Sequence, residues 1–345
     1  MRILVVGAGS TGGFFGACLA RAGRDVTFLV RAGRAHQLQQ EGLQVLSPHG
    51  DFVLTPQLVG AEHLDGPYDL ILLTVKAYAL EAALRDIVPA VGPGTMILPV
   101  LNGMHQVDAI VDHFGRGPLL GGVCKIASTL DERGRIVQYG TLNELSYGEM
   151  DGARSERILR LDALLQDAGF DARLSPDIHR EMWEKWVLLA ALGGITCLMR
   201  GNVGSVVAAP QGEAFVNRLL DEVVAVVRAV GLEPREAFLA EARRQLTLHG
   251  SPQTSSMYRD LIGGRPVEAE QIIGDLLGRG QAAGLDLPLL QAAFVHLAVY
   301  EQGNGLSGAV PPRQTGAHRV RCALALSSGR DHVVRPRAAT PAPRR

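Results

Sequence analysis

The feature of this sequence that most constrains its fold is a glycine-rich loop close to the N-terminus. The apolar run Ile3–Val6 leads directly into Gly7-Ala8-Gly9-Ser10-Thr11-Gly12, and the apolar run Phe14–Ala20 follows. A GxGxxG pattern alone is weak evidence, because glycine supplies 41 of the 345 residues. Between a buried strand and a helix, however, the pattern is typical of a dinucleotide-binding βαβ unit. We therefore expect a parallel sheet with helices packed on its faces.

The residues of this loop are suited to holding a pyrophosphate. Gly7 would permit the tight turn, Gly9 would let the backbone approach the phosphates, and Gly12 would let helix and strand pack closely. Unpaired N–H groups and the dipole favour negative charge at the helix N-terminus. We expect six residues to bind the cofactor, namely Gly7, Ala8, Gly9, Ser10, Thr11 and Gly12. The alternative is a glycine turn that joins strand to helix without a ligand.

The second strand indicates which dinucleotide is bound. Val26–Val30 ends where an NAD enzyme would carry Asp or Glu for the ribose 2′-hydroxyl, but Arg31 and then Arg34 follow. Asp25 lies at the opposite end of this strand and cannot substitute. A guanidinium offers a 2′-phosphate charged donors, whereas a carboxylate would repel it. The sequence therefore predicts NADP(H), unless both arginines are ordinary solvated charges.

Composition favours a soluble cytoplasmic protein. The chain is 47% hydrophobic and 20% charged, and its net charge of −1 gives no basic excess for nucleic acid. No apolar stretch is long enough for a membrane span, and the N-terminus enters a strand at once, so we expect no signal peptide. The four cysteines have no CxxC spacing and no histidine cluster, which argues for a reducing compartment and against a bound metal.

The pattern along the chain predicts an α/β fold in two domains. Strands and helices alternate at first, with a hairpin at Leu43–Leu54, a strand at Asp69–Val75, a strand at Thr95–Val100 and further strands within Gly117–Glu149. The sequence from about residue 175 to Tyr300 has a helical pattern. We predict a Rossmann cofactor domain at 1–174, an all-α domain at 175–312 and a basic, disordered tail at 313–345.

Two helix ends are predicted near the domain boundary. A helix is expected over Ser155–Gly169, with Gly169 as its C-cap. The next helix is expected to begin at Ser175-Pro176-Asp177, with Ser175 as N-cap and Pro176 in the first helical position.

Two polar residues follow core strands and are candidates for the site. Lys76 comes after Asp69–Val75, and Asn102 comes after Thr95–Val100. Ligands of open α/β sheets bind beyond the carboxyl ends of the strands, so these residues would face the same crevice as the glycine loop. Each could also be an ordinary loop residue.

The helical region adds three candidates. Lys185 stands between the two tryptophans, Trp183 and Trp186, just before a run with no charged residue. Partial burial of its ammonium would favour proton release near neutral pH. Ser256 and Glu268 follow later. The alternatives without a functional role are that Lys185 is a snorkelling lysine with its stem along the core, and that Glu268 is favoured simply by the helix dipole.

These motifs together resemble the ketopantoate reductase family, the 2-dehydropantoate 2-reductases, over about residues 1–300. The resemblance rests on GAGSTGG, Thr74-Val75-Lys76-Ala77, Leu101-Asn102-Gly103, Trp183-Glu184-Lys185 and Ser255-Ser256-Met257 followed by Asp260 and Glu268. It implies a two-domain enzyme that reduces ketopantoate to pantoate with NADPH, on the route to pantothenate and coenzyme A.

The resemblance also implies a role for each candidate. Lys185 matches the catalytic lysine that protonates the alkoxide, and Glu268 the glutamate that orients substrate. Ser256 matches a serine that contacts the substrate carboxylate. Asn102 and Lys76 match positions beside nicotinamide and substrate, and Arg31 an arginine on the 2′-phosphate.

Two positions depart from the family. Leu189 and Gly193 stand where its members commonly carry asparagines, four and eight residues after the lysine on the same helix face. Loss of these hydrogen-bonding groups predicts a different or bulkier 2-oxo acid as substrate.

Several functions therefore stay open. The first is NADPH-dependent reduction of ketopantoate or a related 2-oxo acid. The second is an NADP-dependent dehydrogenase of the 6-phosphogluconate or β-hydroxyacid type, and the third is a non-catalytic NADP(H)-binding sensor. We expect a small-molecule substrate, no nucleic acid and no membrane as partners, with a homodimer as a further candidate.

Overall fold

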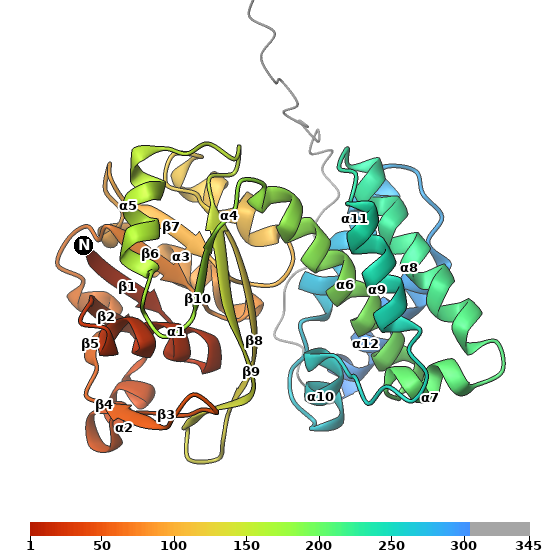
Figure 1. Ribbon diagram of the computed structural model, residues 1–345, viewed down its shortest axis with the longest axis horizontal. Coiled ribbons are helices and arrows are strands. Elements are labelled where there is room, and N and C mark those ends of the chain that lie inside the picture. The colour runs from red at the N-terminus through yellow and green to blue at the C-terminus, as the bar shows by residue number, and fades with distance from the viewer. Residues whose placement is uncertain (304–345) are drawn as a thin grey trace, which may run out of the picture. The chain divides into compact units, whose positions relative to one another are not determined.

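The computed structural model describes residues 1–303, and the predicted tail at 313–345 lies outside this part. The first sheet is entirely parallel, in the strand order β5-β2-β1-β6-β7 (Figure 1). Its strands are β1 (Arg2–Val6), β2 (Asp25–Leu29), β5 (Gln57–Val59), β6 (Leu70–Leu73) and β7 (Met96–Pro99). The chain adds β2 and β5 on one side of β1 and then crosses over to β6 on the other side, which confirms the predicted Rossmann arrangement.

Buried positions on all the central strands explain why this sheet is covered on both faces. Ile3 pairs with Val26 on one side and with Leu70 on the other, and all three side chains are fully or almost fully buried. Continuous apolar runs of this kind are characteristic of parallel sheets with helices on both faces. The helices of this half are α1 (Ser10–Arg21), α2 (Ala32–Glu41), α3 (Leu80–Asp86), α4 (His105–Phe114) and α5 (Glu156–Leu165), with 3₁₀ turns η1 (Ala61–His63), η2 (Ala77–Ala79) and η3 (Val88–Ala90).

A second sheet was not predicted as a unit. It has the order β10-β9-β3-β4, with β8 paired to β9. Its strands are β3 (Leu43–Leu46), β4 (Phe52–Leu54), β8 (Gly121–Leu130), β9 (Ile136–Gly148) and β10 (Asp171–Leu174). The antiparallel β3–β4 hairpin confirms the prediction for Leu43–Leu54. The β8–β9 turn closes at Gly134, whose N–H donates to Asp131 O.

The helical half is built around α6 (Ile178–Met199), which packs against α7, α8, α10 and α12. The other elements are α7 (Val203–Ala208), α8 (Gly212–Ala229), α9 (Glu236–Leu246), α10 (Ser256–Ile262), the π-helical turn η4 (Glu270–Gly274), α11 (Asp275–Ala282) and α12 (Pro288–Gly303). By length and composition α6 could cross a membrane, yet 72% of its most apolar window is buried within the protein. That burial fits the core helix of a globular fold.

The two predicted helix ends near residue 175 are wrong in detail. The helix expected to reach Gly169 stops at Leu165, and Gly169, at φ +84°, lies in the turn before β10. The following helix starts at Ile178 rather than beside Ser175. The Ser175 hydroxyl instead accepts the N–H of Asp177 and donates to Glu181, so this serine closes a turn before the helix.

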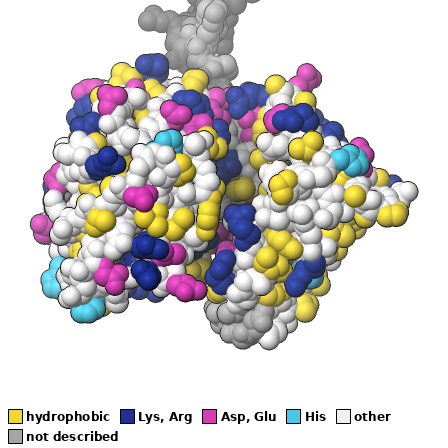
Figure 2. All heavy atoms as spheres, turned by 60° about the horizontal axis from the view of Figure 1, so that its bottom comes forward, with side chains coloured by type: hydrophobic (Ala, Val, Ile, Leu, Met, Phe, Trp, Pro, Cys, Tyr) yellow, Lys and Arg dark blue, Asp and Glu magenta, His cyan; other side chains and the backbone are white. Residues whose placement is uncertain are grey.

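The predicted domain boundary at 174/175 stays a prediction; β10 ends at Leu174 and α6 begins at Ile178. All described residues belong to one compact unit, in which the sheet-bearing half (1–174) and the helical half (175–303) make direct hydrogen bonds. Charges of both signs are interspersed over the face in Figure 2, in line with the near-zero net charge.

Candidate active site

The glycine loop forms a cradle that fits a dinucleotide pyrophosphate. Gly7 has φ +100°, and a Cβ at Gly12 would lie 2.0 Å from Thr74 Oγ1 and 2.3 Å from Gly7 O, so both positions require glycine. Gly9, the N-cap of α1, has open space where a Cβ would stand, and no side chain caps the helix. The first N–H groups of α1 are thus available to an anion.

The two arginines after β2 have different surroundings. Arg34 is tied to the protein, because its Nε donates to Ala8 O at 3.2 Å and its Nη1 to Gln37 Oε1 at 2.7 Å. Burial lowers the pKa of this guanidinium. Arg31 is exposed and forms no side-chain hydrogen bond or ion pair with another described residue. Arg31 is therefore the one of the two whose guanidinium is free to meet a 2′-phosphate.

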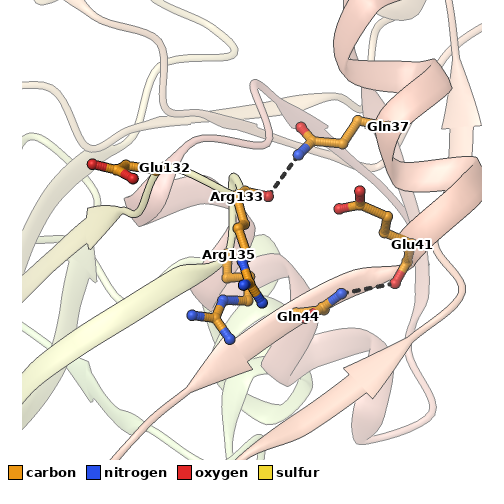
Figure 3. Close-up of a pocket in the computed structure, with 6 residues that line it drawn as sticks. All are labelled: Gln37, Glu41, Gln44, Glu132, Arg133 and Arg135. Carbon is orange, nitrogen blue, oxygen red and sulfur yellow. Dashed lines mark hydrogen bonds between the residues drawn. The ribbon is translucent and has the colours of Figure 1, made fainter.

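A polar pocket lies beside α2 (Figure 3). It is lined by Gln37, Glu41, Gln44, Glu132, Arg133 and Arg135. Gln37 Nε2 donates to Arg133 O at 2.7 Å, so the β8–β9 turn braces the same glutamine that holds Arg34. None of the predicted site residues lines this pocket, and we assign it no part in the reaction.

Lys76 and Glu268, from the two halves of the chain, meet directly. Lys76 Nζ donates to Glu268 Oε2 at 3.3 Å, and the Ala77 N–H lies 3.3 Å from Glu268 Oε1. Desolvation works to lower the pKa of Lys76, but the charges of Glu268 and Asp260 outweigh it and raise this pKa. Glu268 directly precedes Ala269, the helical residue that leads into η4. The side chain of Glu268 is 10% exposed.

Asn102 lies in the loop after β7, next to Gly103 at φ +82°. Its carbonyl accepts a hydrogen bond from Gln271 Nε2 at 3.1 Å. The Asn102 side chain is half-buried and pairs with no other part of residues 1–303. Its amide is thus free for a ligand, while its backbone is fixed by the helical half.

Lys185 projects from α6 toward Cys124 in β8. Its Nζ lies 3.9 Å from Cys124 Sγ, and that thiol in turn lies 3.6 Å from Val100 O, just past the end of β7. Lys185 forms no ion pair with any described carboxylate. The sequence did not reveal Cys124, because an isolated cysteine in a strand carries no signal of the residue it faces.

The tryptophans beside Lys185 are structural. Trp186 Nε1 donates to Ile272 O at 2.9 Å, and Trp183 Nε1 donates to His179 Nε2 at 3.1 Å. Both rings are almost fully buried, with ring centroids 5.1 Å apart. They fix the helix turn that carries Lys185.

Ser256 is not joined to the other predicted residues by a hydrogen bond within residues 1–303. It is exposed at the first position of α10 and its side chain has no partner among the described residues. The neighbouring Ser255 is the N-cap: its Oγ accepts the Tyr258 N–H at 2.9 Å and pairs with Thr196 Oγ1 at 2.9 Å. The Ser255-Ser256 pair thus divides into a capping serine and an exposed one.

The two departures on α6 make its surface apolar. Leu189 is half-buried, and a Cβ at Gly193 would lie 2.7 Å from Met257 Cε. Met257 itself is 3% exposed. The absence of a side chain at residue 193 is what lets Met257 lie against α6.

Comparison with known proteins identifies the family to which this chain belongs. Residues 3–152 match the family described as "Ketopantoate reductase PanE/ApbA", and residues 177–301 match "Ketopantoate reductase PanE/ApbA C terminal". The uncharacterised oxidoreductase YkpB of Bacillus subtilis (strain 168) is 33% identical over 87% of this chain and 99% of its own.

Two solved structures share the fold. The 2-dehydropantoate 2-reductase of Geobacter metallireducens GS-15 has a TM-score of 0.77 and 31% identity, over 87% of this chain and 99% of its own. A D-mandelate dehydrogenase solved with NADH and anilino(oxo)acetate has a TM-score of 0.78 at 22% identity, over 88% and 100%, which shows the fold alone. By its fold and its matches over both halves, the chain is an oxidoreductase that belongs to the ketopantoate reductase family.

Proposed function

We propose that this oxidoreductase uses NADPH to reduce the ketone of a 2-oxo acid, with 2-dehydropantoate, the precursor of pantoate, as the first candidate substrate. The observation that carries the proposal is the meeting of Lys76, Glu268 and the Asn102 loop beyond β6 and β7, with Lys185 reaching the same edge through Cys124. Such strand ends are where α/β sheets bind ligands.

The chain's own residues supply the acid and the positioning groups. The bound nicotinamide supplies the hydride. Lys185 Nζ donates a proton to the carbonyl oxygen as negative charge develops on it, and the ammonium also stabilises that charge. Glu268 and Ser256 orient the substrate, and the Asn102 amide holds the nicotinamide or the substrate carbonyl. Lys76, held by Glu268, places a second cation near the substrate carboxylate and the cofactor.

The free guanidinium of Arg31 supports NADPH over NADH. No carboxylate stands at the end of β2, where an NAD enzyme would bind the ribose 2′-hydroxyl. A related fold has been solved with NADH, so the preference is a property to be measured for this chain. The measurement is the ratio of dissociation constants for NADPH and NADH.

The apolar face of α6 supports a substrate less polar than 2-dehydropantoate. Leu189 and Gly193 offer no hydrogen bond, and Met257 fills the space beside Gly193. Each missing neutral hydrogen bond would cost a hydroxyl-bearing substrate about 0.5–1.5 kcal/mol of binding. A branched or aromatic 2-oxo acid would lose nothing there.

An NADPH-oxidation assay tests the proposal. The substrates would be 2-dehydropantoate, 2-oxoisovalerate, 2-oxoisocaproate and phenylpyruvate, each compared by kcat/KM. Turnover of at least one, lowered by about 10²–10⁴-fold in Lys185→Ala and kept in Lys125→Ala, supports the proposal. Lys125 is a suitable control because it lies beside Cys124 in β8 but pairs with Glu144.

Tight NADPH binding without turnover of any 2-oxo acid would instead favour the sensor. Turnover of a 3-hydroxyacid or of 6-phosphogluconate with NADP⁺, without reduction of 2-oxo acids, would favour the dehydrogenase alternative. We further propose a cytoplasmic location with small-molecule partners, and a homodimer as the assembly to look for by light scattering.

A further inference from the structure

We propose that Gln271 and Gln106 form a clamp that positions the Asn102 loop for catalysis. Both are positioning residues, because the hydrogen bonds of their amide nitrogens go to the loop backbone and from one glutamine to the other. This inference rests on the proposed function, because it assigns the Asn102 amide to the nicotinamide or substrate carbonyl.

The clamp uses three consecutive carbonyl groups of the loop. Gln106 Nε2 donates to Gly103 O at 2.6 Å and, more weakly, to Leu101 O at 3.4 Å. Gln271 Nε2 donates to the carbonyl between them, Asn102 O, at 3.1 Å. The loop backbone is thus held at every residue by a side-chain amide.

The two glutamines also hold each other. Gln271 Nε2 donates to Gln106 Oε1 at 3.0 Å. Gln106 is fully buried and Gln271 is 5% exposed. An amide nitrogen has two N–H groups, and each of these nitrogens makes two hydrogen bonds here. A buried amide that lost its hydrogen-bond partner would leave a desolvated polar group unpaired, which is destabilising. Side-chain conformations of Gln106 and Gln271 that break these hydrogen bonds are therefore disfavoured.

Gly103 allows the helical half to approach this closely. It has φ +82°, and a Cβ there would lie 2.8 Å from the backbone oxygen of Gln271. Any other residue would push the loop away from η4. Gly103 and the clamp together therefore fix the distance between the Asn102 loop and η4, the turn that carries Gln271.

The position of Gln271 couples the two strand-end loops. It lies three residues after Glu268, which holds Lys76 and Ala77 in the loop after β6. One short segment of the helical half therefore holds the loops after β6 and β7 together. The clamp engages the backbone carbonyl of Asn102 and not its side chain, and that side chain has no hydrogen-bond partner among residues 1–303.

Isosteric substitutions test the clamp. Gln271→Met and Gln106→Met keep the length of the side chain and remove the donors. A misplaced Asn102 should lower kcat by about 10- to 100-fold, with the dissociation constant of NADPH changed far less. Because the two residues act as one unit, the double variant should lose about as much as either single variant.

Gln138→Met is the matched control. Gln138 is also buried, at 4% exposure, and it donates to Leu142 O and accepts from Ser47 Oγ, within the second sheet. We expect Gln138→Met to lower the melting temperature about as much as Gln271→Met does, while leaving kcat unchanged. A kcat loss in Gln138→Met equal to that in Gln271→Met would overturn the inference.

Hydrogen exchange of the ligand-free protein gives a readout that does not need turnover. Backbone amides of residues 100–106 should exchange faster in Gln271→Met than in the wild type or Gln138→Met. If the wild type reduces no 2-oxo acid, the proposed function fails, and exchange alone decides whether the clamp holds the loop. Unchanged exchange, or unchanged kcat in an active enzyme, would refute the clamp.

Discussion

The carboxylate of Glu268 binds Lys76 across 192 residues of sequence, with Oε2 at 3.3 Å from Nζ. This contact joins the helical half to the loop after β6, beside which the proposed function puts the substrate. Glu268 also faces the N–H of Ala77, so its two oxygens hold one loop in two places. The pair is therefore the first target for mutagenesis.

Glu268→Gln should raise KM for the 2-oxo acid more than it lowers NADPH affinity. The amide keeps the size but loses the charge that holds Lys76, and a hydrogen bond to a charged group contributes about 1.5–3 kcal/mol. Steady-state kinetics and cofactor titration measure the two effects. The exposed Glu270→Gln, two residues further on, is the control and should change neither. Equal KM values in both variants would show that Glu268 does not orient substrate.

Lys185→Ala should lower kcat by about 10²–10⁴-fold, the usual contribution of a general acid. The ammonium faces only the weak partner Cys124 in the described structure, so its removal breaks no ion pair there. NADPH affinity and the melting temperature should therefore stay near those of the wild type. Near-normal turnover would remove Lys185 from the mechanism.

Arg31→Ala should weaken NADPH binding and leave NADH binding almost unchanged. Loss of a charge-assisted hydrogen bond of about 1.5–3 kcal/mol corresponds to roughly 10- to 150-fold in affinity. Fluorescence titration with both nucleotides measures the ratio. Arg34→Ala is the contrasting variant: this side chain holds Ala8 O, so both nucleotides should bind more weakly. A loss of NADH affinity in Arg31→Ala equal to that of NADPH would contradict the assignment.

Gly12→Ala should destabilise the fold and reduce cofactor binding. The new Cβ would overlap Thr74 Oγ1 and the backbone oxygen of Gly7, and such overpacking costs about 1–3 kcal/mol. Gly33→Ala, in α2, offers the matched control, because nothing lies within 4 Å of its Cβ. We expect that variant to be as stable as the wild type or slightly more so. Denaturant unfolding compares the two.

Glu149→Gln should destabilise the protein at neutral pH and lose this effect in acid. Burial works to raise the pKa of Glu149, but hydrogen bonds from Arg157 and Ser155 outweigh it and lower this pKa. A lowered pKa stabilises the fold above the ordinary value near 4.5, and the contribution disappears as pH falls through the folded pKa. The expected cost at pH 7 is roughly 1.5–3 kcal/mol. A stability difference from wild type that persisted unchanged to pH 3 would contradict this.

The local parts of the fold were readable from the sequence, and the non-local parts were not. The strand, glycine loop and helix at Ile3–Ala20 follow from hydrophobic pattern and turn chemistry over a few residues. The second sheet depends on β3 pairing with β9, some 90 residues later along the chain. No local pattern specifies such a partner.

The same limit applies to the site. Residues at strand ends, such as Lys76 and Asn102, could be found because the topology of α/β sheets gathers them. Cys124 and the Gln106–Gln271 pair could not, because a buried glutamine in a helix looks like a surface one in the sequence. Gly169 misled for a related reason: its positive φ serves a turn before β10, four residues after the helix has ended.

The π-helical turn at Glu270–Gly274 determines the directions in which the side chains of the following α11 point around the helix axis. Gln271 and Arg279 both reach α4, where they meet Gln106 and Asp108. In an unbroken α-helix, residues eight apart point about 80° away from each other around the axis. One extra residue taken up by a wider turn brings them to within about 20°. The meeting of both Gln271 and Arg279 with α4 thus depends on a single surplus residue in the winding of one helix.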